Sequence, residues 1–111
     1  MAIPTFTTQV NSIVTQAQTL GGSCLLIGPF RSQVGAFGAP SYAVQQTYVD
    51  AISSIATARG CDFFDIASIA GFATYEAADA LGYTVGDGIH PSYAGFTQIT
   101  NAIRARIGLW P

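Results

Sequence analysis

Lysine is absent from the sequence, histidine occurs once, and charged residues of either sign are few. Aspartate, glutamate, lysine and arginine together make up 9% of the chain, and the formal net charge is −2 at pH 7. The four arginines are scattered, so we expect no nucleic-acid or anionic-membrane partner. No apolar run reaches the ~18 residues that a membrane span needs. The start, MAIPTFTTQV, lacks the basic and apolar regions of a signal peptide.

Hydrophobic residues account for 50% of the 111 residues, which indicates a folded chain of one small domain at most. Typical domains carry about 25% charged residues. The much lower charge content here predicts that a partner covers part of the surface, in a hetero- or homo-oligomer.

Apolar spacing, glycines and prolines predict helices and strands in alternation. The predicted elements are a helix from 5 to 20, a strand from 24 to 30, a Gly-rich loop from 31 to 40, a helix capped by Ser41 and ended by Gly60, a strand from 61 to 66, short helical pieces within 67–82, and a last helix from about 91 to 107. On the last helix we expect four apolar residues to face inward: Phe96, Ile99, Ile103 and Ile107.

This alternation, with long crossovers, predicts an α/β fold with a parallel sheet and helices on both sides. The first strand is a continuous apolar run, as in strands that are buried on both faces. Two strands alone cannot cover their own edges and faces, and sheets this small are marginal in water. Residues 1–111 are therefore expected to form one partial domain.

Cys24 and Cys61 open the two predicted strands at matching positions. If the strands are parallel neighbours, the sulfurs could form a disulfide, which would stabilise the fold by roughly 4 kcal/mol in the chain-entropy treatment. Two buried free thiols are the alternative, and the one we favour. With a single histidine, the cysteines do not supply a zinc site, so we expect neither metal nor cofactor. The low charge and the disulfide alternative point to an extracellular or virion-associated setting.

The only histidine lies in GDGIHPSYAGF, residues 86–96, three residues after a carboxylate and directly before the last predicted helix. Imidazole is the usual general base near neutral pH. A carboxylate bonded to its Nδ1–H fixes the tautomer and stabilises the imidazolium. Because the turn is glycine-rich, Asp87 and His90 can approach each other, and we predict a catalytic pair. The alternatives are a histidine that bonds only to backbone and an ordinary turn carboxylate.

DGIHPSYAGF resembles the last conserved block of the SGNH (GDSL-type) serine hydrolases, and the order of elements before it is similar too. In that family the Asp and His complete a triad with a Ser near the start of a flavodoxin-like, three-layer domain with five parallel strands. LLIGPF and CDFFDI look like the family's last two strands. The family's Ser, Gly and Asn blocks have no counterpart here, so the resemblance covers the C-terminal half of the family domain.

The resemblance implies an ester hydrolase in which His90 is the general base and Asp87 orients it. The Ser nucleophile and the oxyanion hole would come from another chain or segment, and the substrate would be a small acyl group on a carbohydrate or lipid. The isolated chain should be nearly inactive, because losing a triad serine removes about 10⁶ in turnover. The alternative is a non-catalytic binding or assembly module that docks onto another subunit through its sheet edge.

Three further sites lie where a predicted strand ends, which is where parallel sheets gather functional groups. Arg31 could contact a substrate or a carboxylate from another segment, the alternative being a solvated arginine. Asp65 is a rival carboxylate, although we favour a role in capping the next segment. The loop from 32 to 39 could line a pocket or serve only as a connector.

None of the serines in the chain is the expected nucleophile. Ser23 precedes a strand and so lies at the opposite end of the sheet from His90. Ser32 is on the correct side but lacks a nucleophile-elbow motif. Ser92 is too close in sequence to His90 to be aimed at its ring.

Overall fold

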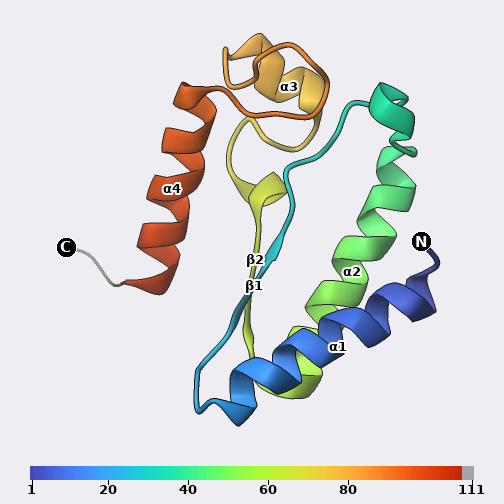
Figure 1. Cartoon of the computed structure of the whole chain (residues 1–111). Coiled ribbons are helices and arrows are strands. Elements are labelled where there is room, and N and C mark those ends of the chain that lie inside the picture. The colour runs from blue at the N-terminus through green and yellow to red at the C-terminus, as the bar shows by residue number, and fades with distance from the viewer. Residues whose placement is uncertain (109–111) are drawn as a thin grey trace.

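The computed structural model describes residues 1–108, which fold into four α-helices and a two-stranded parallel sheet (Figure 1). The elements in chain order are α1 (Ile3–Thr19), β1 (Leu25–Gly28), the 3₁₀ turn η1 (Ala36–Gly38), α2 (Tyr42–Arg59), β2 (Asp62–Asp65), the 3₁₀ turn η2 (Ile66–Ser68), α3 (Tyr75–Ala80) and α4 (Tyr93–Ile107). The predicted alternation of helices and strands is confirmed. Within residues 1–108, none of the helices combines the length and apolar character that a membrane crossing requires.

The ends of the helices follow from local sequence. Ser41 caps α2 with its hydroxyl, and Gly60 closes the helix in the left-handed conformation at φ 69°. Ser92 caps α4 in the same way. Helix α4 begins later than predicted because Pro91 is paired with Thr84 in an isolated antiparallel bridge. The proline therefore ends the preceding turn instead of starting the helix.

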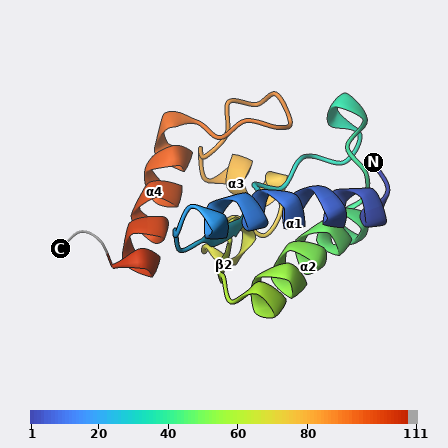
Figure 2. The ribbon, with the colours of Figure 1, turned by 60° about the horizontal axis from the view of Figure 1, so that its bottom comes forward.

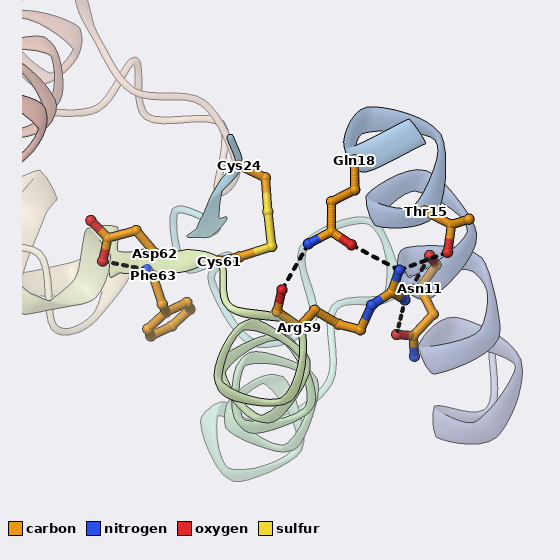
Figure 3. Close-up of a disulfide and its surroundings, with 8 residues drawn as sticks. All are labelled: Asn11, Thr15, Gln18, Cys24, Arg59, Cys61, Asp62 and Phe63. Carbon is orange, nitrogen blue, oxygen red and sulfur yellow. Dashed lines mark hydrogen bonds between the residues drawn. A yellow bond between two sulfur atoms is a disulfide. The ribbon is translucent and has the colours of Figure 1, made fainter. Parts of the chain in front are cut away.

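Strands β1 and β2 are parallel neighbours, with Gly28 opposite Asp65. Directly before them, Cys24 and Cys61 form a disulfide with their Cα atoms 5.0 Å apart (Figure 3). The expectation of two free thiols is therefore wrong. The parallel register brings the residues that precede both strands within bridging distance.

Helix α2 packs against both strands, and α1 packs on α2 (Figures 1 and 2). The buried side chains of this layer are Val14 from α1 and Val49, Ile55 and Ala56 from α2. Arg59 fastens the end of α2 to α1, since its guanidinium donates hydrogen bonds to side-chain oxygens of three α1 residues, Asn11, Thr15 and Gln18 (Figure 3).

Helices α4 and α2 lie on opposite sides of the strands in both ribbon views (Figures 1 and 2). A second core forms there around Phe72, Ala78 and Ile99, the last of these from α4. An ion pair between Arg106 and Asp62 joins the far end of α4 to the start of β2. Helix α3, which contributes Ala78 to this core, is also bonded directly to α2, since the Tyr42 hydroxyl accepts from the Tyr75 N–H at 3.1 Å and donates to Glu76 at 2.5 Å.

The molecule is thin and open. Its extents are 41 × 40 × 17 Å, and its radius of gyration of 14.8 Å exceeds the ~13 Å typical of a domain of this length. Several large apolar side chains remain exposed on the described residues, among them Phe96 and Ile107. The prediction that these two face inward is wrong, since Phe96 is 54% and Ile107 37% exposed, whereas Ile103 packs against the core. Ile99 is buried as expected.

Candidate active site

The turn between α3 and α4 carries the predicted Asp–His pair and is closed by backbone hydrogen bonds. The Val85 N–H donates to the His90 carbonyl at 3.1 Å, and the Ser92 N–H donates to the Tyr83 carbonyl at 2.9 Å. Together with the bridge at Pro91, these bonds hold the two ends of the turn side by side. The pair thus lies on a closed loop at the start of a helix.

Gly88 is the point where this turn rests on the loop after β1. Its φ is +91°, and a Cβ there would lie 2.5 Å from the Cβ of Ala36, so only glycine fits. Its carbonyl accepts from the Gln33 N–H at 2.7 Å, and its own N–H donates to the Tyr75 hydroxyl at 3.0 Å. At Gly95, a Cβ would collide with the carbonyl of Tyr83.

Asp87 uses both oxygens of its carboxylate within the turn. Oδ1 accepts from the backbone N–H groups of Ile89 at 3.0 Å and of His90 at 2.8 Å. Oδ2 lies 2.5 Å from Nδ1 of the His90 ring. The Ile89 N–H, and then the bonds from the His90 side chain and backbone, lower the pKa of Asp87 from 3.8 to about 2. The group is therefore a carboxylate at neutral pH.

The His90 side chain is 63% exposed, and Nδ1 is the ring nitrogen that is bonded to Asp87. A carboxylate can only accept, so Nδ1 carries the proton and Nε2 is left with a free lone pair. This is the tautomer of a general base. The structure thus brings the two predicted residues together, with the ring bonded to Asp87 and not to backbone.

A hydrogen-bond network behind the turn, centred on the buried Tyr75, was not predicted from the sequence. The Tyr75 hydroxyl donates to Thr84 Oγ1 at 2.9 Å, and that hydroxyl in turn donates to Asp79 at 2.5 Å. Thr84 also accepts from the Gly86 N–H at 3.1 Å. The network holds α3 against the turn. The spacing of these residues in the sequence matches none of the motifs considered above, so the sequence carried no signal for the network.

Arg31 is 3% exposed and is held by groups of this chain. Nη1 donates to the Pro29 carbonyl at 2.7 Å and to Asp65 Oδ1 at 3.1 Å. Nη2 donates to Gln46 Oε1 at 3.1 Å and to Asp65 Oδ2 at 2.8 Å. The solvated alternative is wrong, and all the terminal N–H groups are engaged. Contact with a substrate stays a prediction, for which only the Nε–H is left.

Asp65 serves the role that we favoured. Besides the ion pair, its Oδ1 accepts from the Ala67 N–H at 3.0 Å and caps η2. Among the serines, Ser92 is engaged at the start of α4, where its hydroxyl donates to the Gly82 carbonyl at 2.8 Å. No serine within residues 1–108 hydrogen-bonds to the His90 ring.

A pocket of about 660 Å³ lies between α2 and the loop that follows β1. Ile89, next to His90, forms part of its wall, as do Ser32 and residues 36–39. The predicted loop from 32 to 39 therefore lines a pocket, and it does so directly beside the Asp–His turn. Sequence reasoning did not foresee the contribution of α2, which comes from Val44, Gln45, Tyr48 and Val49.

Residues 1–108 bring together no three His, Cys, Asp or Glu side chains that could hold a metal ion. Comparison of the chain with protein-family models, curated proteins and solved structures finds no match. What the site can do therefore follows from its own groups: an ionised carboxylate, an oriented imidazole and an adjoining pocket.

Proposed function

We propose that this chain is the C-terminal half of an SGNH-like serine esterase domain and supplies His90 and Asp87 to its catalytic triad. The observation that carries the proposal is the hydrogen bond between Asp87 Oδ2 and His90 Nδ1, 2.5 Å long, on a ring whose side chain is 63% exposed. In the flavodoxin-like fold of that family, β1 and β2 would be the last two strands of a three-layer sheet.

In this proposal His90 Nε2 takes the proton from a serine hydroxyl as that oxygen attacks the ester carbonyl. Asp87 stabilises the imidazolium and remains ionised throughout, in keeping with its lowered pKa. The imidazolium then gives the proton to the leaving alcohol, and the acyl-enzyme forms. Water, deprotonated by the same nitrogen, releases the acid. The serine and the oxyanion donors come from another chain or segment.

The open side of the molecule supports a partner of this kind. A sheet of two strands has two free edges, and the molecule is only 17 Å thick. Strand edges and apolar faces of this extent are normally paired or covered. Further parallel strands beside the sheet would cover them and would bring their own carboxyl ends to the rim near the Asp–His turn.

The test compares hydrolysis of p-nitrophenyl acetate by the isolated chain and by the assembly recovered from its natural source. We expect the chain alone to be nearly inactive and the assembly to be active. His90→Ala should lower turnover of the assembly by about 10⁶-fold. Gln98→Ala, at an exposed position of α4, should leave turnover unchanged. Activity of the assembly that survives His90→Ala would contradict the triad.

A second function, a non-catalytic module that docks through its sheet edge, is favoured by the free strand edges alone. It predicts a different outcome for the same variants. The assembly would still form with His90→Ala, and no ester hydrolysis would depend on the imidazole. Formation of the assembly and loss of hydrolysis are therefore measured on the same preparation.

A further inference from the structure

We propose that the pocket beside the Asp–His turn binds the hydrocarbon part of the ester's acyl chain. The proposal rests on the proposed function for its substrate, and on the pocket for everything else. A volume of about 660 Å³ lies within the ~300–1,000 Å³ range of small-molecule sites. Ile89 brings the wall of this pocket to the residue next to the general base.

The wall of the pocket is fastened to the turn that carries His90. The Gln33 N–H donates to the Gly88 carbonyl at 2.7 Å, and Ala36, a wall residue, lies against Gly88. Pocket and base are thus held at a set separation. An acyl chain in the pocket would lie against Ile89, the residue next to His90.

Three of the polar side chains in the wall, those of Gln45, Tyr48 and Arg31, are already engaged with the protein itself. The Gln45 amide donates to the carbonyls of Ser32 and Pro40 and accepts from the Ser32 N–H. The Tyr48 hydroxyl donates to the Met1 carbonyl. The terminal N–H groups of Arg31 are taken by its own partners. What this wall offers is therefore mainly apolar surface, which suits an uncharged hydrocarbon chain.

A polypeptide segment fits this wall less well than an acyl chain does. Each residue of a polypeptide brings a backbone N–H and a carbonyl that must find partners when buried. The N–H groups of the Gln45 amide and the hydroxyl proton of Tyr48 are already donated to carbonyls of this chain, so they are not available as donors to the carbonyls of a bound polypeptide. An acyl chain makes no such demand.

Phe37 provides a second, independent observation at this pocket. Its φ of 51° is left-handed, which is strained for a bulky residue, and its side chain is 85% exposed. Neither the left-handed backbone nor the exposed aromatic ring stabilises the fold. Backbone strain of this kind is found mainly at ligand and active sites. Phe37 is part of the wall, so its exposed ring is available to contact a bound chain.

The experiment is a ¹⁵N–¹H NMR titration of the full chain with ethyl hexanoate, with ethyl acetate as the short-chain control. We expect saturable shifts at residues 36–40, 44–49 and Ile89 with the hexanoate and much weaker ones with the acetate. Phe37→Asn keeps a residue that tolerates the left-handed backbone, so the melting temperature should not fall. Its Kd for ethyl hexanoate should rise about fivefold or more.

Leu20→Ala is the matched control, because Leu20 is an equally exposed apolar residue that does not line the pocket; it should leave the Kd unchanged. The proposal is overturned if ethyl hexanoate causes no saturable shifts, or shifts only on α4, or if Phe37→Asn binds as tightly as the wild type. The titration does not need His90, so His90→Ala should bind equally well. If His90→Ala abolishes hydrolysis but ethyl hexanoate does not bind, the pocket proposal is wrong and the triad stands. If ethyl hexanoate binds but His90→Ala leaves hydrolysis unchanged, the triad is wrong and the pocket proposal stands.

Discussion

Two pairs of a carboxylate with a basic side chain lie near the carboxyl ends of the strands, and they are built in opposite ways. Asp65 meets Arg31 in the interior, and each terminal nitrogen of the guanidinium has two acceptors. Asp87 meets His90 at the surface, and only one ring nitrogen is engaged. The first pair has its hydrogen-bonding groups almost fully used, whereas the second keeps a lone pair for a reacting proton.

Under the proposed function, the difference separates a pair that holds the fold together from a pair that exchanges a proton with a substrate. A buried pair of charges must satisfy its own groups, because an unpaired charge in the interior is costly. A pair that acts on a substrate must leave one group unsatisfied and within reach of solvent. Burial as the criterion for a catalytic pair would have pointed to Arg31 and Asp65. An unpaired hydrogen-bonding group as the criterion points to His90 and Asp87.

Among substitutions of the carboxylates in these pairs, the largest effect is expected from Asp87→Asn. The asparagine keeps the Oδ1 that accepts the two backbone N–H groups, so the turn should persist. Its amide would donate to His90 Nδ1 and force the ring proton onto Nε2, which then cannot act as a base. Turnover of the assembly should fall by about 10⁴-fold, and ¹⁵N NMR of the isolated chain should show the changed tautomer.

The control is Asp62→Asn, since Asp62 pairs with Arg106 at the other end of the strand. That variant should leave turnover and the His90 tautomer unchanged. An unaltered tautomer in Asp87→Asn would show that the carboxylate does not orient the ring.

A smaller effect, on folding and not on turnover, is expected from Asp65→Ala. Arg31 would remain buried without its counter-charge, which should lower the free energy of unfolding by about 3–5 kcal/mol. Asp62→Ala removes an exposed ion pair and should lower it by less than about 1 kcal/mol. Urea unfolding followed by circular dichroism measures both. Equal losses in the two variants would remove the distinction between a buried and an exposed pair.

The smallest effect concerns acid. The pKa of Asp87 is lowered from 3.8 to about 2, so its ionised form is favoured by folding. That contribution to stability is fully present above pH 3.8 and is lost as the pH falls through 2. A ¹³C NMR titration of the Asp87 carboxyl should show a midpoint near 2.

In His90→Ala the bond from the ring is lost while the backbone N–H bonds of Ile89 and residue 90 stay. The midpoint should therefore rise, yet remain below 3.8. A wild-type midpoint at or above 3.8 would mean that the turn does not hold the carboxylate as described.

Local signals were sufficient for the order of elements and for the Asp–His pair. Ser41 and Gly60 mark the ends of α2 through capping and left-handed φ, both of which are properties of single residues. Asp87 and His90 belong to one glycine-rich turn, so their approach depends on few dihedral angles. Predictions of this kind need no knowledge of the rest of the fold.

Long-range partners could not be read in the same way. Arg31 and Asp65 lie 34 positions apart, and they meet because the parallel register sets Gly28 opposite Asp65. The cysteines meet through the same register. Phe96 lies on a helical stripe that predicts burial, yet a stripe does not say which element provides the cover, and none of residues 1–108 does so.

Gly88 and Gly95 have a consequence for the ancestry of this chain. At either position a side chain would strike a neighbouring segment, so descendants that keep the turn must keep both glycines even after most other residues have drifted. Overall sequence identity falls as other residues change, whereas the steric requirement for glycine at these two positions does not change. Distant homologues should therefore be sought by the pattern of Asp87, His90 and the two glycines, Gly88 and Gly95.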